Sequence, residues 1–328
     1  MTTRPLVIAH RGASGYRPEH TASAYRLAID LGADAVEPDL VPTKDGVLVI
    51  RHENEISGTT DVAQHPEFAE RRTTKVVDGV EHRGWFTEDF TWAELSTLRA
   101  RERLAGTRPD NVAFDGREGI LRLSDLIDIL EGAERPVMMI AELKHAAYFA
   151  SIDLGLEERF AGQISEWAGP DNLVVECFEQ SSLERVRELG VPGGVTFLVE
   201  AQGAPADQVA QFGDGARSYA SYLTDEGLAA LANEVTGVSV DKALLFERDA
   251  RGEVTGTTNL IDRAHDAGLE TFTWTLRAEN QFLEPSFRRG AAEELGDWER
   301  EFGLILGTGV DGVFADQPDL AIRVRDNL

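Results

Sequence analysis

Cysteine is almost absent from this sequence: Cys177 is the only one in 328 residues. An internal disulfide bond is therefore excluded, and we interpret the lone thiol as a buried structural side chain. Long apolar runs are missing too, because no uncharged stretch approaches the length needed to cross a membrane. Residues 1–5 lack the basic and apolar regions of a secretion signal. The sequence predicts a cytoplasmic protein without a membrane anchor, or an extracytoplasmic one if a signal peptide has been removed.

Basic residues are few relative to acidic ones. The chain has 32 Lys and Arg against 58 Asp and Glu, which gives a formal net charge of −26. A field of that sign repels phosphate backbones and anionic membranes, so nucleic acid is not predicted as a partner. An anionic substrate would need a bound cation or clustered Lys and Arg to reverse the field locally.

Short apolar runs alternate with amphipathic, helix-length segments along most of the chain. The first are PLVIAH at 5–10, TASAYRLAIDLGA at 21–33 and DAVEPDLV at 34–41. Strands separated by helices favour parallel βαβ units, because parallel strands need a crossover to join them. About eight such strands fit the length. We predict a single (β/α)8 TIM barrel over residues 1–328, with a doubly wound open sheet as the alternative.

Residues 54–118 break this alternation. They are charged and irregular apart from one helix predicted to start near Thr91, where Glu94 completes a capping box. We expect this stretch to be an insertion after the third barrel strand. Such an insertion lies at the C-terminal mouth of a barrel, where active sites are built. The sequence therefore predicts a small cap over the site.

Polar side chains collect where the apolar strands end. Residues i and i+2 of a strand point to the same side, and the C-terminal strand ends of a barrel meet at one face. The polar residues at the ends of four consecutive apolar runs are His10 and Arg11, Glu37 and Asp39, His52, and Glu142 and Lys144. We predict that these side chains converge on one small ligand.

Three of the converging side chains are carboxylates. Ionised carboxylates raise one another's pKa when they are crowded, unless a cation lies among them. Oxygen ligands indicate a hard ion, Ca²⁺ or Mg²⁺, rather than zinc. The ion, with Arg11 and Lys144, would supply the positive charge that an anionic substrate needs. Two histidines beside it suit acid and base roles in phosphate-ester cleavage, since their pKa lies near working pH.

Several motifs resemble those of the glycerophosphodiester phosphodiesterase family: HRG at 10–12, PEHT at 18–21, ExD at 37–39, TKDG at 43–46, RH at 51–52 and ExK at 142–144. Two further segments, TTDVA at 59–63 and GWFTEDFTWAEL at 84–95, resemble its periplasmic-type branch, whose barrel carries an insertion after the third strand. The resemblance is dense from residue 5 to 145 and thinner beyond.

The resemblance implies a role for each site residue. The implied roles are metal ligands for Glu37, Asp39 and Glu142, acid and base for His10 and His52, and substrate binding for Arg11, Lys144 and Trp274. The chain departs from the family's usual pattern at His20, where Asn is common, and at Glu53, where Asp is common. It departs again at His145, where a proline or small turn residue is usual.

The activity implied by the resemblance is metal-dependent hydrolysis of a glycerophosphodiester, such as glycerophosphocholine or glycerophosphoethanolamine. The products would be sn-glycerol 3-phosphate and an alcohol. One alternative is a phospholipase D-like or glycerol-phosphate polymer phosphodiesterase that uses the same site on a larger substrate. An alternative of another class is a non-catalytic barrel that binds a glycerophosphodiester. The sequence leaves the head group, the ion and the oligomeric state open.

Overall fold

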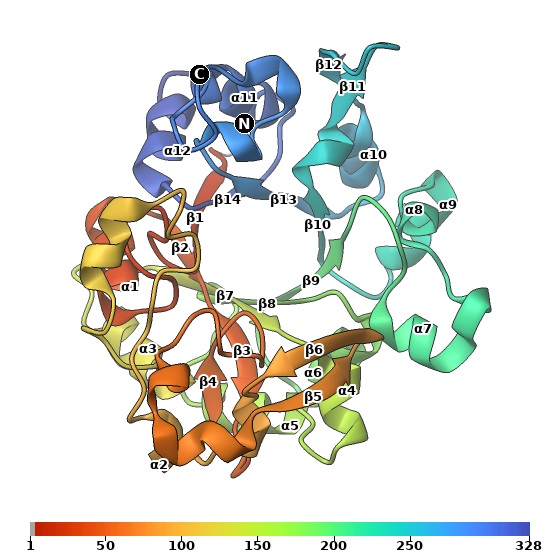
Figure 1. Ribbon diagram of the computed structural model, residues 1–328. Coiled ribbons are helices and arrows are strands. Elements are labelled where there is room, and N and C mark those ends of the chain that lie inside the picture. The colour runs from red at the N-terminus through yellow and green to blue at the C-terminus, as the bar shows by residue number, and fades with distance from the viewer. Residues whose placement is uncertain (1–3) are drawn as a thin grey trace.

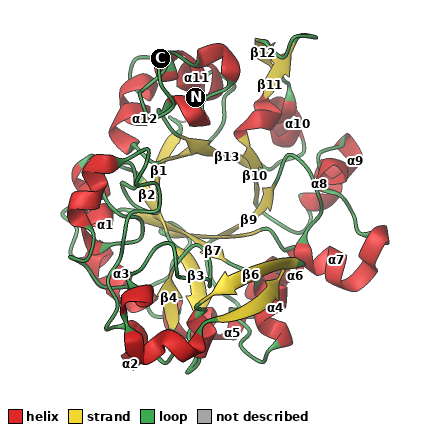
Figure 2. Ribbon diagram, in the orientation of Figure 1, coloured by secondary structure: helices red, strands yellow, loops and turns green. Residues whose placement is uncertain are grey.

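The structure, a computed structural model, describes residues 4–328. Eight parallel strands form a closed ring with helices around it (Figures 1 and 2). They are β1 (Leu6–His10), β2 (Ala35–Glu37), β7 (Met138–Leu143), β8 (Leu173–Cys177), β9 (Gly194–Val199), β10 (Gly237–Asp241), β13 (Glu270–Leu276) and β14 (Gly312–Ala315). Strand β2 pairs with both β1 and β7, which closes the ring. The predicted TIM barrel is confirmed.

Amphipathic helices cover the outside of the ring (Figure 2). They are α1 (Ala22–Asp30), α3 (Leu123–Glu131), α4 (Ala146–Ser151), α5 (Glu157–Ile164), α6 (Gln180–Glu188), α7 (Ala206–Phe212), α8 (Tyr219–Tyr222), α9 (Asp225–Leu231), α10 (Leu260–Asp266), α11 (Trp298–Leu306) and α12 (Pro318–Arg325). Helix α1 begins after Thr21, whose side chain accepts a hydrogen bond from the Ala24 backbone. Within residues 4–328, no helix is long and apolar enough to cross a membrane.

The barrel interior has an apolar floor and a polar layer above it. The floor consists of Ile8, Ala35, Ile140, Val174, Phe272 and Phe314, which form one buried cluster. Side chains two residues further along a strand point to the same side. The residues at those positions are His10, Glu37, Glu142, Glu176, Trp274 and Asp316. The alternation of the strands thus places a layer of chemically active side chains on the floor.

The segment predicted as the third barrel strand forms a strand but does not join the barrel. It is β4 (Leu48–Ile50), and it runs antiparallel to β3 (Asp39–Pro42), which continues β2 beyond Pro38. A tight turn causes this reversal: the Val47 backbone donates a hydrogen bond to Thr43 Oγ1 at 3.0 Å, and Gly46 adopts φ 80°. The third barrel strand along the chain is therefore β7.

The insertion, residues 54–118, contains little regular structure. It has a hairpin of β5 (Thr73–Val77) and β6 (Val80–Gly84), drawn in orange in Figure 1, and the short helix α2 (Trp92–Leu95). The predicted capping box of Thr91 and Glu94 is present at the start of α2. Short 3₁₀ turns make up much of the rest. A second hairpin, β11 (Phe246–Arg248) with β12 (Val254–Thr257), follows β10.

Candidate active site

A cavity of about 1070 Å³ opens at the C-terminal ends of the barrel strands. Of the predicted site residues, those that line it are His10, Arg11, Glu37, His52, Glu142, Lys144 and Trp274. Asp39 is 1% exposed and lies next to this lining, with its Oδ1 atom 3.8 Å from Lys144 Nζ. The structure therefore brings the predicted residues together at one mouth.

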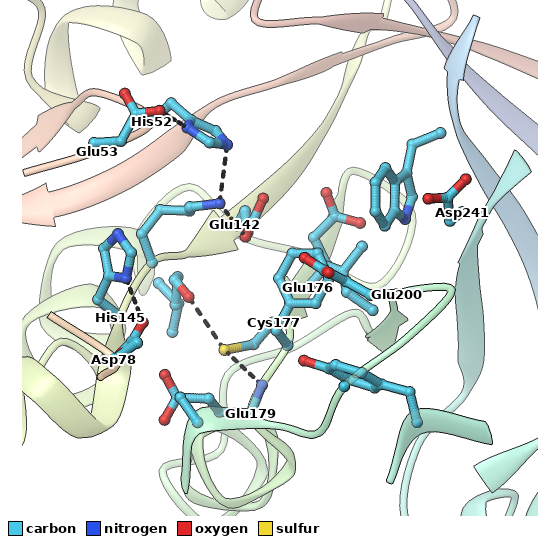
Figure 3. Close-up of a pocket in the computed structure, with 18 of the residues that line it drawn as sticks. His52, Glu53, Asp78, Glu142, His145, Glu176, Cys177, Glu179, Glu200 and Asp241 are labelled. Atoms are coloured by element: carbon cyan, nitrogen blue, oxygen red, sulfur yellow. Dashed lines mark hydrogen bonds and ion pairs between the residues drawn. The ribbon is translucent and has the colours of Figure 1, made fainter. Parts of the chain in front are cut away.

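Three buried glutamates form a carboxylate cluster inside the cavity. One oxygen each of Glu37, Glu142 and Glu176 lies within 4.8 Å of the others. Figure 3 shows Glu142 and Glu176 near the centre of the cavity. Burial and then the other carboxylates raise the pKa of Glu37 and of Glu176 well above their usual range. Burial also raises the pKa of Glu142 to about 8, although Lys144 acts against this.

The carboxylate cluster fits a hard divalent cation. Glu37 Oε1 and Glu176 Oε2 are buried and have no hydrogen-bond partner among the described residues. Buried carboxylate oxygens are normally paired or bound to a metal, because leaving them unpaired costs free energy. Mutually repelling oxygen donors without nitrogen or sulfur are the ligand type of Ca²⁺ or Mg²⁺.

Asp39 shares Arg11 and Lys144 with the carboxylate cluster and also contacts His20. His20 Nε2 donates to Asp39 Oδ2 at 2.8 Å, and Arg11 Nε lies 3.3 Å from the same oxygen. Burial would raise the pKa of Asp39, but His52, Lys144 and Arg11 hold it well below its usual range. Its Oδ1 has no hydrogen-bond partner in the described chain. The prediction that Asp39 binds the metal stays a prediction.

Glu176 was not predicted from the sequence. It lies in the apolar run NLVVECF at 172–178. A charged residue inside such a run is the one sequence signal that could have identified it as a site residue. Strand β8 aligns Glu176 directly with Glu142 of β7. The sequence gives a third glutamate in the same layer of the barrel, but only the pairing of β7 with β8 reveals it.

His10 is the last residue of β1 and is held by the opposite end of the chain. Its Nδ1 lies 2.6 Å from Asp316 Oδ1, immediately after β14. The other oxygen of Asp316 accepts hydrogen bonds from Arg108 at 2.6 Å and from Arg277 at 2.8 Å. Burial and then Arg11 lower the pKa of His10 to about 4, although Asp316 acts in the opposite direction. His10 is therefore neutral at neutral pH.

His52 follows β4 and is held in a similar way. Its Nδ1 lies 2.5 Å from Glu53 Oε1 (Figure 3), and Lys144 Nζ donates to its Nε2 at 3.2 Å. Burial, then Arg11 and Lys144, lower the pKa of His52 to about 3. Burial and neighbouring cations therefore favour the neutral form of both candidate catalytic imidazoles.

Arg11 and Lys144 supply positive charge next to the carboxylate cluster. The Arg11 backbone, at φ 58°, donates a hydrogen bond to Glu37 Oε2 at 2.8 Å, and Lys144 Nζ donates to Glu142 Oε1 at 2.7 Å. Both side chains line the cavity. They place two positive charges on the cavity wall, where an anionic ligand would meet them.

Trp274 forms an aromatic wall with Phe178, a residue that the sequence analysis did not select. The two rings meet edge to face with centroids 5.7 Å apart, and Lys144 Nζ lies 5.6 Å from the centre of the Phe178 ring. Both rings line the cavity. An apolar wall beside charged groups suits a ligand with one polar and one apolar side.

The loop at His145, whose shape was not predicted, reaches the hairpin of the insertion. His145 adopts φ 55°, and its Nδ1 lies 2.5 Å from Asp78 Oδ2 in the β5–β6 turn (Figure 3). Asp78, Gly79 and Val80 all line the cavity. The insertion thus contributes residues to the cavity wall.

Comparison with protein families gives a match over residues 10–320 to the glycerophosphoryl diester phosphodiesterase family. The chain belongs to this family. Its similarity extends to glycerophosphodiester phosphodiesterase GDPD6 of Arabidopsis thaliana, with 31% identity over 96% of this chain and 84% of that protein. A putative glycerophosphodiester phosphodiesterase of Bacillus subtilis, YhdW, is 26% identical over 97% of this chain and 96% of the relative. The predicted family and enzyme class are confirmed.

Solved structures share the fold. A putative glycerophosphoryl diester phosphodiesterase from Silicibacter pomeroyi superposes with a TM-score of 0.71 at 19% identity, covering 100% of this chain and 95% of the other. A phosphodiesterase from Oleispira antarctica, solved with its product sn-glycerol-3-phosphate, gives 0.63 at 19% identity, covering 98% and 97%. At 19% identity, the structural similarity supports the fold of this chain, a closed barrel.

Proposed function

We propose that this phosphodiesterase hydrolyses small glycerophosphodiesters, such as glycerophosphocholine, to sn-glycerol 3-phosphate and an alcohol with the help of one divalent cation. The observation that carries the proposal is the meeting of the carboxylate cluster, two cationic side chains and two neutral imidazoles in one cavity. The product held by the Oleispira antarctica relative supports the glycerol phosphate half of the substrate.

Glu37, Glu142 and Glu176 would hold the cation, with Asp39 as a further candidate ligand. When bound, Ca²⁺ or Mg²⁺ would polarise a phosphoryl oxygen and offset the charge that develops on it. Arg11 and Lys144 would bind the phosphate oxygens beside the ion. Trp274 would form the wall against which the glycerol carbons pack.

His10 and His52 would exchange the protons of the reaction. A general base must begin neutral, and both imidazoles meet that condition. A general acid must begin protonated. The negative charge of a bound phosphodiester would raise the pKa of a nearby imidazole, because it opposes the effect of Arg11 and Lys144. Substrate binding would thereby prepare one histidine as the acid and leave the other as the base.

We also propose that residues 54–118 act as a cap of the single barrel domain. Asp78, Gly79 and Val80 of the hairpin border the cavity, and the His145 contact holds the hairpin turn there. These contacts support a role in shaping the entrance.

The decisive experiment measures release of glycerol 3-phosphate from glycerophosphocholine, coupled to glycerol-3-phosphate dehydrogenase. Protein treated with EDTA is compared with the same protein after Ca²⁺ or Mg²⁺ is restored. We expect release only when an ion is present. Absence of release with every divalent ion tested, from protein that remains folded, would contradict the proposal.

A lysophospholipid is the second candidate substrate, because the cavity has an apolar rim. Val80 and Val209 both line it and are 56% and 49% exposed. The volume of about 1070 Å³ exceeds the upper end of the usual range for small-ligand sites. The test compares kcat/KM for lysophosphatidylcholine and for a glycerol-phosphate polymer with that for glycerophosphocholine. A higher value for either larger diester would replace our first choice.

A further inference from the structure

Behind His10 lies a chain of buried charges that ends in the insertion. Asp316 Oδ1 contacts His10 Nδ1 at 2.6 Å, and Arg108 donates to Asp316 Oδ2 at 2.6 Å. Arg108 also donates to Glu279 at 2.6 Å and to the Ser14 carbonyl at 2.9 Å. Asp316 is 2% exposed and Arg108 is 7% exposed. Arg108 of the insertion and Arg277, which follows β13, therefore both hold the carboxylate that contacts the imidazole.

Behind His52 the same order of groups recurs. Glu53 Oε1 contacts His52 Nδ1 at 2.5 Å. Arg103 donates a hydrogen bond to each carboxylate oxygen of Glu53, at 2.8 and 2.6 Å. Arg103 is held in turn by both oxygens of Glu19, at 2.8 and 2.7 Å. Two-pronged pairing of this kind fixes the orientation of a carboxylate as well as its position.

The two arginines come from one short stretch of the insertion. Residues 101–108 form neither helix nor strand, so side-chain contacts set the position of this stretch. A cleft of only about 20 Å³ remains between it and His10, Arg11 and Asp316. The stretch therefore packs closely against the back of the candidate catalytic groups.

Stability alone does not explain this arrangement. The pair of Arg108 with Asp316 is buried, and the cost of removing two charges from water offsets most of their attraction. The pair of Arg103 with Glu53 is partly exposed, and water weakens its attraction. A hydrogen bond that a histidine N–H donates to a carboxylate, in contrast, selects one tautomer and one ring orientation. A rigid carboxylate does this better than a mobile one.

We propose that Arg103 and Arg108 are positioning residues, one for each histidine: Arg103 orients His52 through Glu53, and Arg108 orients His10 through Asp316. The insertion is then part of the catalytic apparatus as well as a cover. This inference rests on the proposed function in one respect, that the two imidazoles carry the acid and base roles. The pairing of each arginine with one histidine stands on its own contacts.

The first test is a kinetic comparison of Arg103→Gln and Arg108→Gln with wild type. We expect kcat to fall about 10–100-fold, the usual effect of losing a group that orients a ligand or catalyst, with KM within about threefold. Lysine keeps the positive charge but lacks the planar guanidinium that makes two parallel hydrogen bonds. We therefore expect Arg103→Lys and Arg108→Lys to have a kcat between those of wild type and the glutamine variants. The matched control is Arg101→Gln, whose side chain is exposed and lies 3.5 Å from Asp115, away from the cavity.

The second test follows the imidazole nitrogens by NMR in protein labelled with ¹⁵N-histidine, with signals assigned from His10→Ala and His52→Ala. Arg108→Gln should shift the His10 nitrogen signals and leave those of His52 in place, and Arg103→Gln should do the reverse. If either variant shifts both histidines equally, or neither, the one-to-one positioning role is wrong. Unchanged kcat in both variants would overturn it as well.

A variant that fails to fold is replaced by one that keeps the shape of the carboxylate. Asp316→Asn and Glu53→Gln remove the charge behind His10 and His52, and we expect kcat to fall about 10²–10⁴-fold, as when a triad carboxylate becomes an amide. The NMR readout needs no turnover. Paired shifts in the two arginine variants, together with a wild type that shows no hydrolysis, would refute the proposed function and leave the positioning intact. An active wild type whose arginine variants lack the paired shifts would refute the positioning alone.

Discussion

Glu142 and Glu176 are direct neighbours across strands β7 and β8, and both carboxylates face the barrel interior. No hydrogen bond joins the two carboxylates. Lys144 occupies one oxygen of Glu142, while Glu176 Oε2 has no partner among residues 4–328. Two adjacent strands thus present two buried acids to the same space, and this relationship makes the metal site testable residue by residue.

Glu176→Gln should weaken binding of Ca²⁺ or Mg²⁺ by about tenfold or more, because the amide removes one charged oxygen donor from the carboxylate cluster. Isothermal titration calorimetry on EDTA-treated protein measures the change. Glu142→Gln should act in the same direction, with activity partly restored by excess ion. The control is Glu200→Gln, which lines the cavity outside the cluster and should bind the ion normally. Normal binding in Glu176→Gln, together with lost binding in Asp39→Asn, would assign the site to Glu37, Asp39 and Glu142.

Replacement of either histidine should remove proton transfer while sparing the fold. We expect His10→Ala and His52→Ala to lower kcat by about 100-fold or more, the scale of lost acid-base catalysis. Steady-state kinetics measures the effect, and circular dichroism with a thermal melt checks that each variant is folded. Near-wild-type kcat in either variant would show that the assigned role is wrong.

Glu179 should make stability fall as pH rises. Burial, and then repulsion from Asp78, raise its pKa from 4.5 to about 8 in the folded protein. Between those values the native state holds a proton that the unfolded state has released, so increasing pH favours unfolding. In Glu179→Gln the side chain keeps an oxygen to accept the hydrogen bond from the Ala147 backbone. Thermal melts should show that the Tm advantage of the variant over wild type grows from about pH 5 to about pH 8. A constant Tm difference would contradict the shifted pKa.

Val209→Asp tests whether the apolar rim contacts an acyl chain. If lysophosphatidylcholine is a substrate, its kcat/KM should fall about tenfold, because the change removes apolar contact and adds charge. The kcat/KM for glycerophosphocholine should stay as in wild type, because that substrate has no acyl chain to contact the rim. Val112→Asp is the control, because Val112 is 39% exposed and lies outside the cavity. Equal losses for both substrates would place Val209 outside any acyl-specific contact.

Much of the site could be predicted because strand geometry is local. Each barrel strand places side chains two residues apart on one side, so His10, Glu37 and Glu142 were identifiable as inward-facing strand ends. Segments with the spacing of amphipathic helices lie between the apolar runs, and this alternation indicated a barrel. These are properties of neighbouring residues, which a single sequence contains.

The parts that could not be predicted depend on contacts between distant segments. Asp316 and Arg108 lie 208 positions apart and meet only because the insertion packs onto the end of β14. The orientation of β4 depended on whether residues 43–46 form a tight turn or a longer connection, and its apolar pattern is the same in either direction. Glu176 resembled an interruption of an apolar strand until its alignment with Glu142 was known.

The pairing of β1 with β14 has a consequence for how the protein is made. Asp316 leaves the ribosome only after 306 residues have been added beyond His10. A nascent chain that has reached residue 300 already contains every glutamate of the carboxylate cluster, both insertion arginines and both histidines. It still lacks β14, the last of the eight barrel strands, and the carboxylate behind His10. Synthesis of the last barrel strand is thus the step at which the folding chain acquires a complete active site.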